Sequence, residues 1–187
     1  MKTAIVNGTK ISPEAVALEL ERLVRFYRSH GMGDDEIRGT LTLLRDKALE
    51  QAIGAKLLLD KAENLDMKPT AAEIDAEVAK VVAQIGSEEE YRKALAAQGL
   101  SEENFRAELA KGAKVNKLVA QALAHVEEPS EQAVADFYAA HRTEYSPRTL
   151  VDAHDEIKDL LRHDLRGKAM NAYIAELREG AKIEYVK

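Results

Sequence analysis

The pattern of apolar and polar residues is that of β-structure at both ends of the chain. Residues 3–11 read Thr-Ala-Ile-Val-Asn-Gly-Thr-Lys-Ile, and the Asn7-Gly8 pair predicts a tight hairpin turn because both residues tolerate positive φ angles. Residues 181–187 alternate apolar and polar side chains, which predicts a single strand. A lone strand leaves backbone donors and acceptors without partners, and an isolated hairpin is only marginally stable. We therefore expect the last strand to pair with the first hairpin.

Between these ends, apolar residues recur at helical spacing, and capping residues predict where the helices begin. Ser12 followed by Pro13 starts a first helix that we expect to end near Ser29. Thr70 and Ser87 each precede a glutamate by three positions, the pattern of a capping box. The predicted helices span approximately residues 13–29, 34–65, 70–85, 87–98, 101–125, 130–142 and 151–178. We expect a mainly α protein with a small antiparallel β element formed by the N-terminal hairpin and the C-terminal strand.

Composition and charge narrow the classes of function. The 187 residues are 45% apolar and 32% charged, which is typical of a folded globular chain. The net charge is −6 and no basic run interrupts the sequence, so we expect no nucleic-acid binding. No apolar stretch approaches the roughly 20 residues that span a bilayer, so we expect no membrane insertion. The chain has no cysteine, and Met1-Lys2 leads directly into a predicted strand, so we expect neither a disulfide nor a secretory leader.

The histidines do not predict a metal site. His154 and His163 lie nine positions apart in the last predicted helix, so they do not share a face as an i, i+4 pair would. Each is followed by an aspartate, but adjacent helical side chains point about 100° apart. Solvated helix surface is the simpler interpretation, and we expect no metal ligand among them.

Motifs that carry catalysis are also missing from the sequence. The acidic runs 34–36 and 88–90 stand at predicted helix starts, where free amides and the helix dipole favour carboxylates. The Gly-Met-Gly break at 31–33 follows no strand and carries no Lys-Ser/Thr pair, so it is a poor phosphate cradle. The sequence has no serine elbow, no HExxH motif and no cysteine nucleophile. We expect no catalytic residue and no cofactor, which favours a binding protein over an enzyme.

Aromatic and methionine side chains near helix ends are the remaining candidates for contact with another molecule. Most such residues belong to the core, but methionine and aromatic side chains in a groove adapt readily to apolar segments of a partner. The candidate residues for such contact are Phe26, Tyr27, Met32, Met67, Tyr91 and Phe105.

Several segments, taken in order, resemble the sequence pattern of one known protein family. The Val-Asn-Gly-Thr-Lys-Ile-Ser run at 6–12, followed by a helix, is similar to the start of the mature family members. A Leu-x-x-x-Ile stripe before Lys-Leu-Leu, within 49–59, resembles their second-helix motif. Further similar segments are 69–75, 91–105, 130–145 and the last helix with 181–186. Together these segments resemble the chaperone core of the SurA/PrsA-type foldases of the parvulin family. The resemblance covers nearly the whole chain and implies a SurA N-terminal-like multi-helix chaperone core.

The sequence departs from that family in one respect. In the family a parvulin prolyl isomerase domain separates the lead-in helix from the return helix, whereas Tyr145 and Asp152 are only seven positions apart here. The parvulin marks, an early His-Ile-Leu strand and a Gly-Gly-x-Leu-Gly loop, are absent. The resemblance implies three parts: a helical chaperone domain with the hairpin at 1–128, a lead-in helix and linker where a parvulin domain would be inserted at 129–148, and a return helix and strand completing the core at 149–187. A natural short form and a removed domain both fit this pattern.

Three hypotheses of function follow. The resemblance implies an ATP-independent chaperone for unfolded or nascent polypeptide clients, in the periplasm or envelope of a bacterium, with a cytoplasmic location as the alternative. The second is a prolyl isomerase-related protein with residual activity. The third is a self-associating module: if the return helix cannot fold back across the short link at Ser146-Pro147, it would dock on a second copy and form a domain-swapped homodimer.

Overall fold

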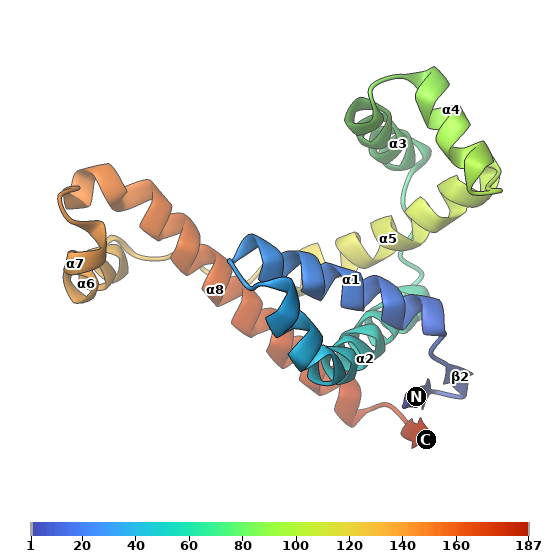
Figure 1. Ribbon diagram of the computed structural model, residues 1–187, viewed down its shortest axis with the longest axis horizontal. Coiled ribbons are helices and arrows are strands. Elements are labelled where there is room, and N and C mark those ends of the chain that lie inside the picture. Colours follow the sequence, from blue (N-terminus) through green and yellow to red (C-terminus); the bar gives the residue numbers. More distant parts are fainter. Residues whose placement is uncertain (1, 187) are drawn as a thin grey trace. The chain divides into compact units, whose positions relative to one another are not determined.

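A computed structural model describes residues 2–186 as a mainly helical chain with a small sheet (Figure 1). The expected fold class is confirmed. The elements are β1 (Thr3–Val6), β2 (Thr9–Lys10), α1 (Pro13–Ser29), α2 (Asp34–Asn64), α3 (Ala71–Ile85), α4 (Glu88–Ala97), α5 (Glu102–Ala122), α6 (Glu131–Ala140), α7 (Arg142–Tyr145), α8 (Leu150–Glu179) and β3 (Ile183–Val186). No helix within residues 2–186 combines the length and the apolar character needed to cross a membrane.

The helices begin where the sequence predicts because the capping side chains bind free backbone amides. The hydroxyl oxygens of Ser12, Thr70, Ser87 and Ser130 each accept a hydrogen bond from the amide three residues later, at 3.1 to 3.2 Å. The short helix α7 is not predicted by the sequence, whose pattern ends the preceding helix near residue 142 and indicates a linker at 145–148. The Tyr138 hydroxyl donates a 2.8 Å hydrogen bond to the carbonyl of Arg148, which closes the turn around α7.

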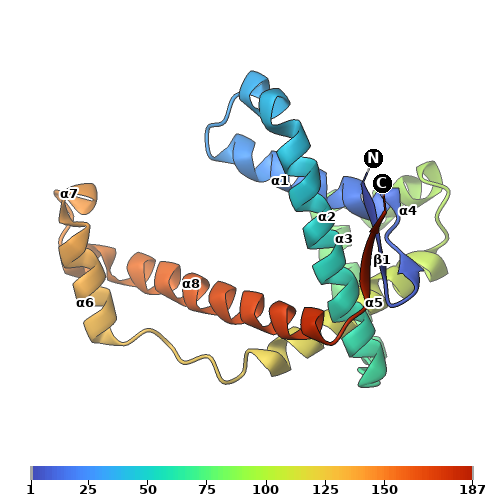
Figure 2. The ribbon, with the colours of Figure 1, turned by 90° about the horizontal axis from the view of Figure 1, so that it is seen from below.

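The sheet joins the two ends of the described chain, as predicted. Its strand order is β2-β1-β3, and both pairings are antiparallel, with Val6 opposite Thr9 on one side and opposite Ile183 on the other. In Figure 2 the dark red C-terminal strand lies alongside β1. Asn7, at a φ of 49°, also contacts the C-terminal segment. Its backbone N–H donates to the carbonyl of Lys182 at 2.9 Å, and its side-chain Oδ1 accepts from the backbone N–H of Lys182 at 3.0 Å.

One face of the sheet packs on α2 and forms the main core. The apolar side chains of β1 and the facing part of α2 are almost completely shielded from solvent, and parts of α1 and of the chain after residue 176 pack around them. The buried members are Ala4, Val6, Ile11, Leu49, Ala52, Ile53 and Leu57. Alternation along β1 and helical spacing along α2 bring these residues to one interface.

A polar cluster fastens β3 to α2 at the edge of this core. The Arg178 guanidinium donates to the Glu50 carboxylate at 2.7 Å and to the Tyr185 hydroxyl at 3.0 Å. That hydroxyl donates in turn to the second oxygen of Glu50 at 2.9 Å. Partial burial and the neighbouring Glu50 carboxylate raise the pKa of Tyr185, so the phenol keeps the proton that this contact requires. The last helix and the last strand are therefore tied to the same residue of α2.

The described chain divides into two compact units. The first comprises residues up to Leu118 and from Glu176 onward, and the second comprises Val119–Ala175. Within the first unit, α3, α4 and α5 enclose a cluster centred on Val78, Tyr91 and Leu95. Within the second, α6 and α8 pack through Val134, Ala153 and Ile157, with partly buried aromatic residues around them. The expected boundaries at 128 and 148 concern an inserted domain and stay a prediction.

Strand β3 pairs with β1 of its own chain. The short Ser146-Pro147 link therefore does not prevent the return segment from reaching the core. A domain-swapped homodimer would make the same β1–β3 contacts between two copies, and it stays a prediction.

The main core generates a stability prediction. Replacing Ile53, which is 0% exposed, by alanine leaves a cavity beneath β1 and should lower the free energy of unfolding by about 2–5 kcal/mol. Leu43→Ala on the same helix is the matched control, because Leu43 is 69% exposed, and it should change stability by less than about 0.5 kcal/mol. Urea unfolding followed by circular dichroism measures both variants. Equal losses would contradict the assignment of this interface as the main core.

Candidate functional site

A groove in the first unit has features of a binding site. It has a volume of about 820 Å³ and is bordered by β2, the first turns of α1, the middle of α2 and the middle of α5. We call it the α1/α2/α5 groove. Its apolar lining residues are Ile11, Ala15, Leu18, Ala52, Ala55, Leu58, Leu59 and Val115. This volume lies within the range of about 300–1,000 Å³ found for ligand pockets.

The groove presents apolar surface to solvent. Leu18 is 48% exposed, and Leu59 and Val115 are half-buried. Leu18 lies outside the apolar stripe by which α1 packs on α2, so the fold of the unit does not cover it. An exposed leucine has little meaning alone, but several apolar side chains around one hollow indicate a surface for binding.

A second hollow of about 710 Å³ lies on the other side of α1. Its apolar part is formed by Val16, Leu20 and Leu49, and its charged part includes Lys2 and Asp46, whose side chains form an ion pair at 3.2 Å. The first helix is thus flanked by two hollows with apolar linings. Both belong to the same compact unit.

The candidate residues near the end of α1 lie outside both hollows. Phe26 is 53% exposed, and its ring stacks on His30 at 4.1 Å between centroids. Tyr27 is half-buried and accepts a 3.2 Å hydrogen bond from the Lys47 ammonium. Met32 is half-buried in the turn before α2. Client contact by these residues stays a prediction, and Phe26 has the most exposed surface.

The remaining candidates lie near α3, α4 and α5. Met67 is half-buried in the connection after α2. Tyr91 is only 1% exposed and packs edge-on against Phe105, with 5.7 Å between ring centroids. Burial and the nearby carboxylates of Glu102 and Glu88 raise the pKa of Tyr91. Tyr91 therefore acts as the central packing residue of this cluster, and a client contact through it would require the cluster to open.

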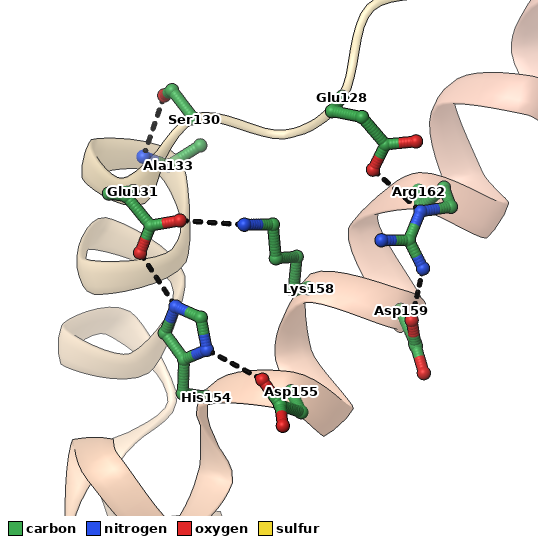
Figure 3. Close-up of polar contacts among 9 residues, drawn as sticks. All are labelled: Glu128, Ser130, Glu131, Ala133, His154, Asp155, Lys158, Asp159 and Arg162. Atoms are coloured by element: carbon green, nitrogen blue, oxygen red, sulfur yellow. Dashed lines mark hydrogen bonds and ion pairs between the residues drawn. The ribbon is translucent and has the colours of Figure 1, made fainter.

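The second unit contains a cluster of charged side chains, drawn in Figure 3. The Glu131 carboxylate, in the first turn of α6, receives Lys158 Nζ at 2.7 Å and His154 Nε2 at 2.6 Å. His154 Nδ1 lies 2.9 Å from Asp155 Oδ1. The hydrogen bond from Lys158, then that from His154, lowers the pKa of Glu131 to about 2. Side chains from α8 thus hold the start of α6 in place.

A second contact of the same kind precedes α6. The Arg162 guanidinium donates to Glu128 at 2.6 Å and also pairs with Asp159 on its own helix (Figure 3). Within residues 2–186, no group of three or more histidine, cysteine, aspartate or glutamate side chains has the arrangement of a metal site. The cluster is therefore best interpreted as a set of ion pairs that dock α6 on α8.

Sequence reasoning missed parts of both sites. The angular argument that separated His154 from Asp155 was too strict, because the flexible carboxylate reaches the ring across one helical step. Glu131 is 23 positions from His154, and no local pattern links them. For the groove, the available signal was Leu18, a leucine outside the predicted stripe of its helix.

The sequence of this chain can be compared with those of known proteins. Residues 1–119 match the family described as the SurA-like N-terminal domain. The chain is 21% identical over 173 residues to the foldase protein PrsA from two strains of Clostridium kluyveri, an alignment covering 83% of this chain and 50% of that protein. It therefore spans about half the length of the curated relatives it matches.

A solved structure shows the same fold. It comes from a description of PEB4 and Cj1289 as two structurally related SurA-like chaperones of Campylobacter jejuni, and the match covers 99% of this chain and 98% of that chain. The TM-score is 0.61 and the sequence identity is 14%. The architecture of the described residues is thus that of a SurA/PrsA-type chaperone core. The chain belongs to the SurA-like N-terminal domain family, whose pattern covers more than half of it.

The histidine cluster predicts a pH dependence. Hydrogen bonds to Asp155 and Glu131 raise the pKa of His154 above its ordinary 6.5, because the doubly protonated ring satisfies both carboxylates. A raised pKa means that this stabilisation is complete below about pH 6.5 and is lost as the pH rises through the folded-state value. Hydrogen exchange of the α6 amides, corrected for intrinsic rates, should therefore show less protection at about pH 8.5 than at about pH 5.5.

Two glutamine variants separate this effect from other titrations. His154→Gln should remove the difference in α6 protection between the two pH values. His163→Gln, on the same helix and exposed, should retain it. The same pH difference in both variants would show that another group is responsible.

Proposed function

We propose that this chain is an ATP-independent chaperone module that binds unfolded or partly folded polypeptides in the α1/α2/α5 groove. The observation that carries the proposal is the exposed apolar lining of this groove in a member of the SurA-like family. Binding would bury apolar side chains of the client against the leucines of α1 and α2, at about 25 cal/mol per Å² of apolar surface removed from water. Such burial is non-directional, which suits clients of varied sequence.

We further infer that the chain has no prolyl isomerase activity of its own. In the relatives called foldases, the matched region is half of the protein, so activities of the whole relative do not transfer to this chain. Helices α7 and α8 are separated by residues 146–149 alone. The Arg148 side chain bridges this connection to Glu156 at 2.7 Å and to the Asp152 carbonyl at 2.9 Å. This short, bridged connection supports the proposal that no isomerase domain is inserted between α7 and α8.

The bacterial cell envelope is the proposed location. Cj1289, one of the two SurA-like chaperones in the structural comparison, is described as a periplasmic protein. A cytoplasmic location is the alternative. Self-association through a swapped β3 is compatible with the groove, because β3 is not among its lining residues.

Suppression of client aggregation tests the main proposal. The chain should reduce light scattering of a chemically denatured client on dilution, without ATP and at a near-stoichiometric ratio. Leu18→Asp should weaken this suppression several-fold, because it places a charge in the apolar lining of the groove. Leu43→Asp should retain it, since Leu43 is exposed on α2 and lies outside the groove.

Circular dichroism of both variants checks that the fold is intact. Full suppression by Leu18→Asp would place client binding elsewhere. No suppression by the unmodified chain, together with no binding of unfolded peptide, would overturn the proposal as a whole.

A proline-limited peptide assay tests the isomerase inference. We expect cis/trans exchange to proceed at the uncatalysed rate, with a time constant of about tens to hundreds of seconds at 25 °C. A rate that increases with protein concentration, and that persists in independently purified preparations, would contradict the inference.

A further inference from the structure

The charges around the α1/α2/α5 groove differ from those of the whole chain. Four cations, Lys10, Arg22, Lys56 and Lys111, line the groove together with two carboxylates, Glu19 and Glu108. The complete chain has a net charge of −6. The border of the groove is therefore locally basic on an acidic protein.

Each carboxylate at the border is already paired with a neighbouring cation. Arg22 lies 2.7 Å from Glu19, and Lys111 lies 2.6 Å from Glu108. Lys56 pairs with Asp60, which is not a lining residue. A basic client residue would have to compete with these cations for their carboxylates.

Of the four lining cations, Lys10 is the one without an ion pair to a described carboxylate. It is exposed, and no carboxylate within residues 2–186 pairs with its ammonium group. It stands at the end of the groove where α1 begins, beside Ser12 and Ala15. The N-terminus of a helix carries partial positive charge, which adds to that of Lys10. Glu14 offsets part of this field but is not among the lining residues.

We propose that the groove selects apolar client segments that carry an adjacent acidic residue. The apolar stretch would lie on the leucines, and the acidic side chain would lie at the Lys10 end. This selectivity rests on the proposed chaperone function and adds the class of client segment to it. An exposed ion pair contributes up to about 1 kcal/mol, so the preference is at most about fivefold in Kd and decreases with salt.

Three fluorescent peptides test this selectivity. They share one apolar segment and differ only in the flanking pair, which is Asp-Asp, Ser-Ser or Lys-Lys. With the unmodified chain at low ionic strength, fluorescence anisotropy should give the tightest binding for the acidic peptide and the weakest for the basic one. Added salt of about 0.5 M should bring the three Kd values together, because the Debye length falls to a few ångströms.

Charge-reversal variants assign the preference to the groove. Lys10→Glu should remove or reverse the order of the three peptides. Arg166→Glu is the matched control, because Arg166 is an exposed cation in the second unit, and it should leave the order unchanged.

The outcomes separate the two proposals. Equal binding of all three peptides, or an acidic preference that survives in Lys10→Glu, would overturn the selectivity and leave the chaperone groove standing. Failure of every peptide to bind the unmodified chain would overturn both.

Discussion

The antiparallel pairing of β1 with β3 is the constraint on which the rest of the first unit depends. It places Val6 opposite Ile183 and so fixes the end of α8 against the beginning of the chain. The same sheet covers the apolar face of α2, and the Arg178–Glu50–Tyr185 contacts hold its outer edge there. Because β2 continues directly into α1, this pairing also positions the wall of the groove that Leu18 and Lys10 form.

The groove exists because the core does not use every apolar residue of its helices. Helix α1 packs by one stripe, and Leu18 faces away from that stripe into a hollow shared with α2 and α5. Burial of the Leu18 side chain against another part of the chain would raise the free energy of unfolding. Its exposure is therefore a loss of stability of the kind that a binding surface requires. The paired charges around the groove keep its border polar. The stripe that packs on α2 and the proposed binding surface thus lie on different faces of α1.

Sequence reasoning succeeded where the determinants are local. The Asn7-Gly8 turn, the serine and threonine caps and the helical stripes each depend on residues a few positions apart, and they predicted nearly every element. Apart from the pairing of β1 with β3, which the unpaired backbone of a lone strand required, it failed where distant segments meet. Glu131 and His154 come together only after α6 docks on α8. The buried position of Tyr91 likewise depends on Phe105 from the next helix, so its exposure could not be inferred from its own neighbours.

The order of the sheet also has a consequence for synthesis. Strand β1 is made first and its partner β3 is made more than 170 residues later, since β1 ends at Val6 and β3 begins at Ile183. Until then one side of β1 is an open edge, a feature that promotes aggregation in other proteins. The apolar face of α2 likewise lacks its complete cover during that time. The sheet of this core therefore cannot be completed until the segment that forms β3 has been synthesised.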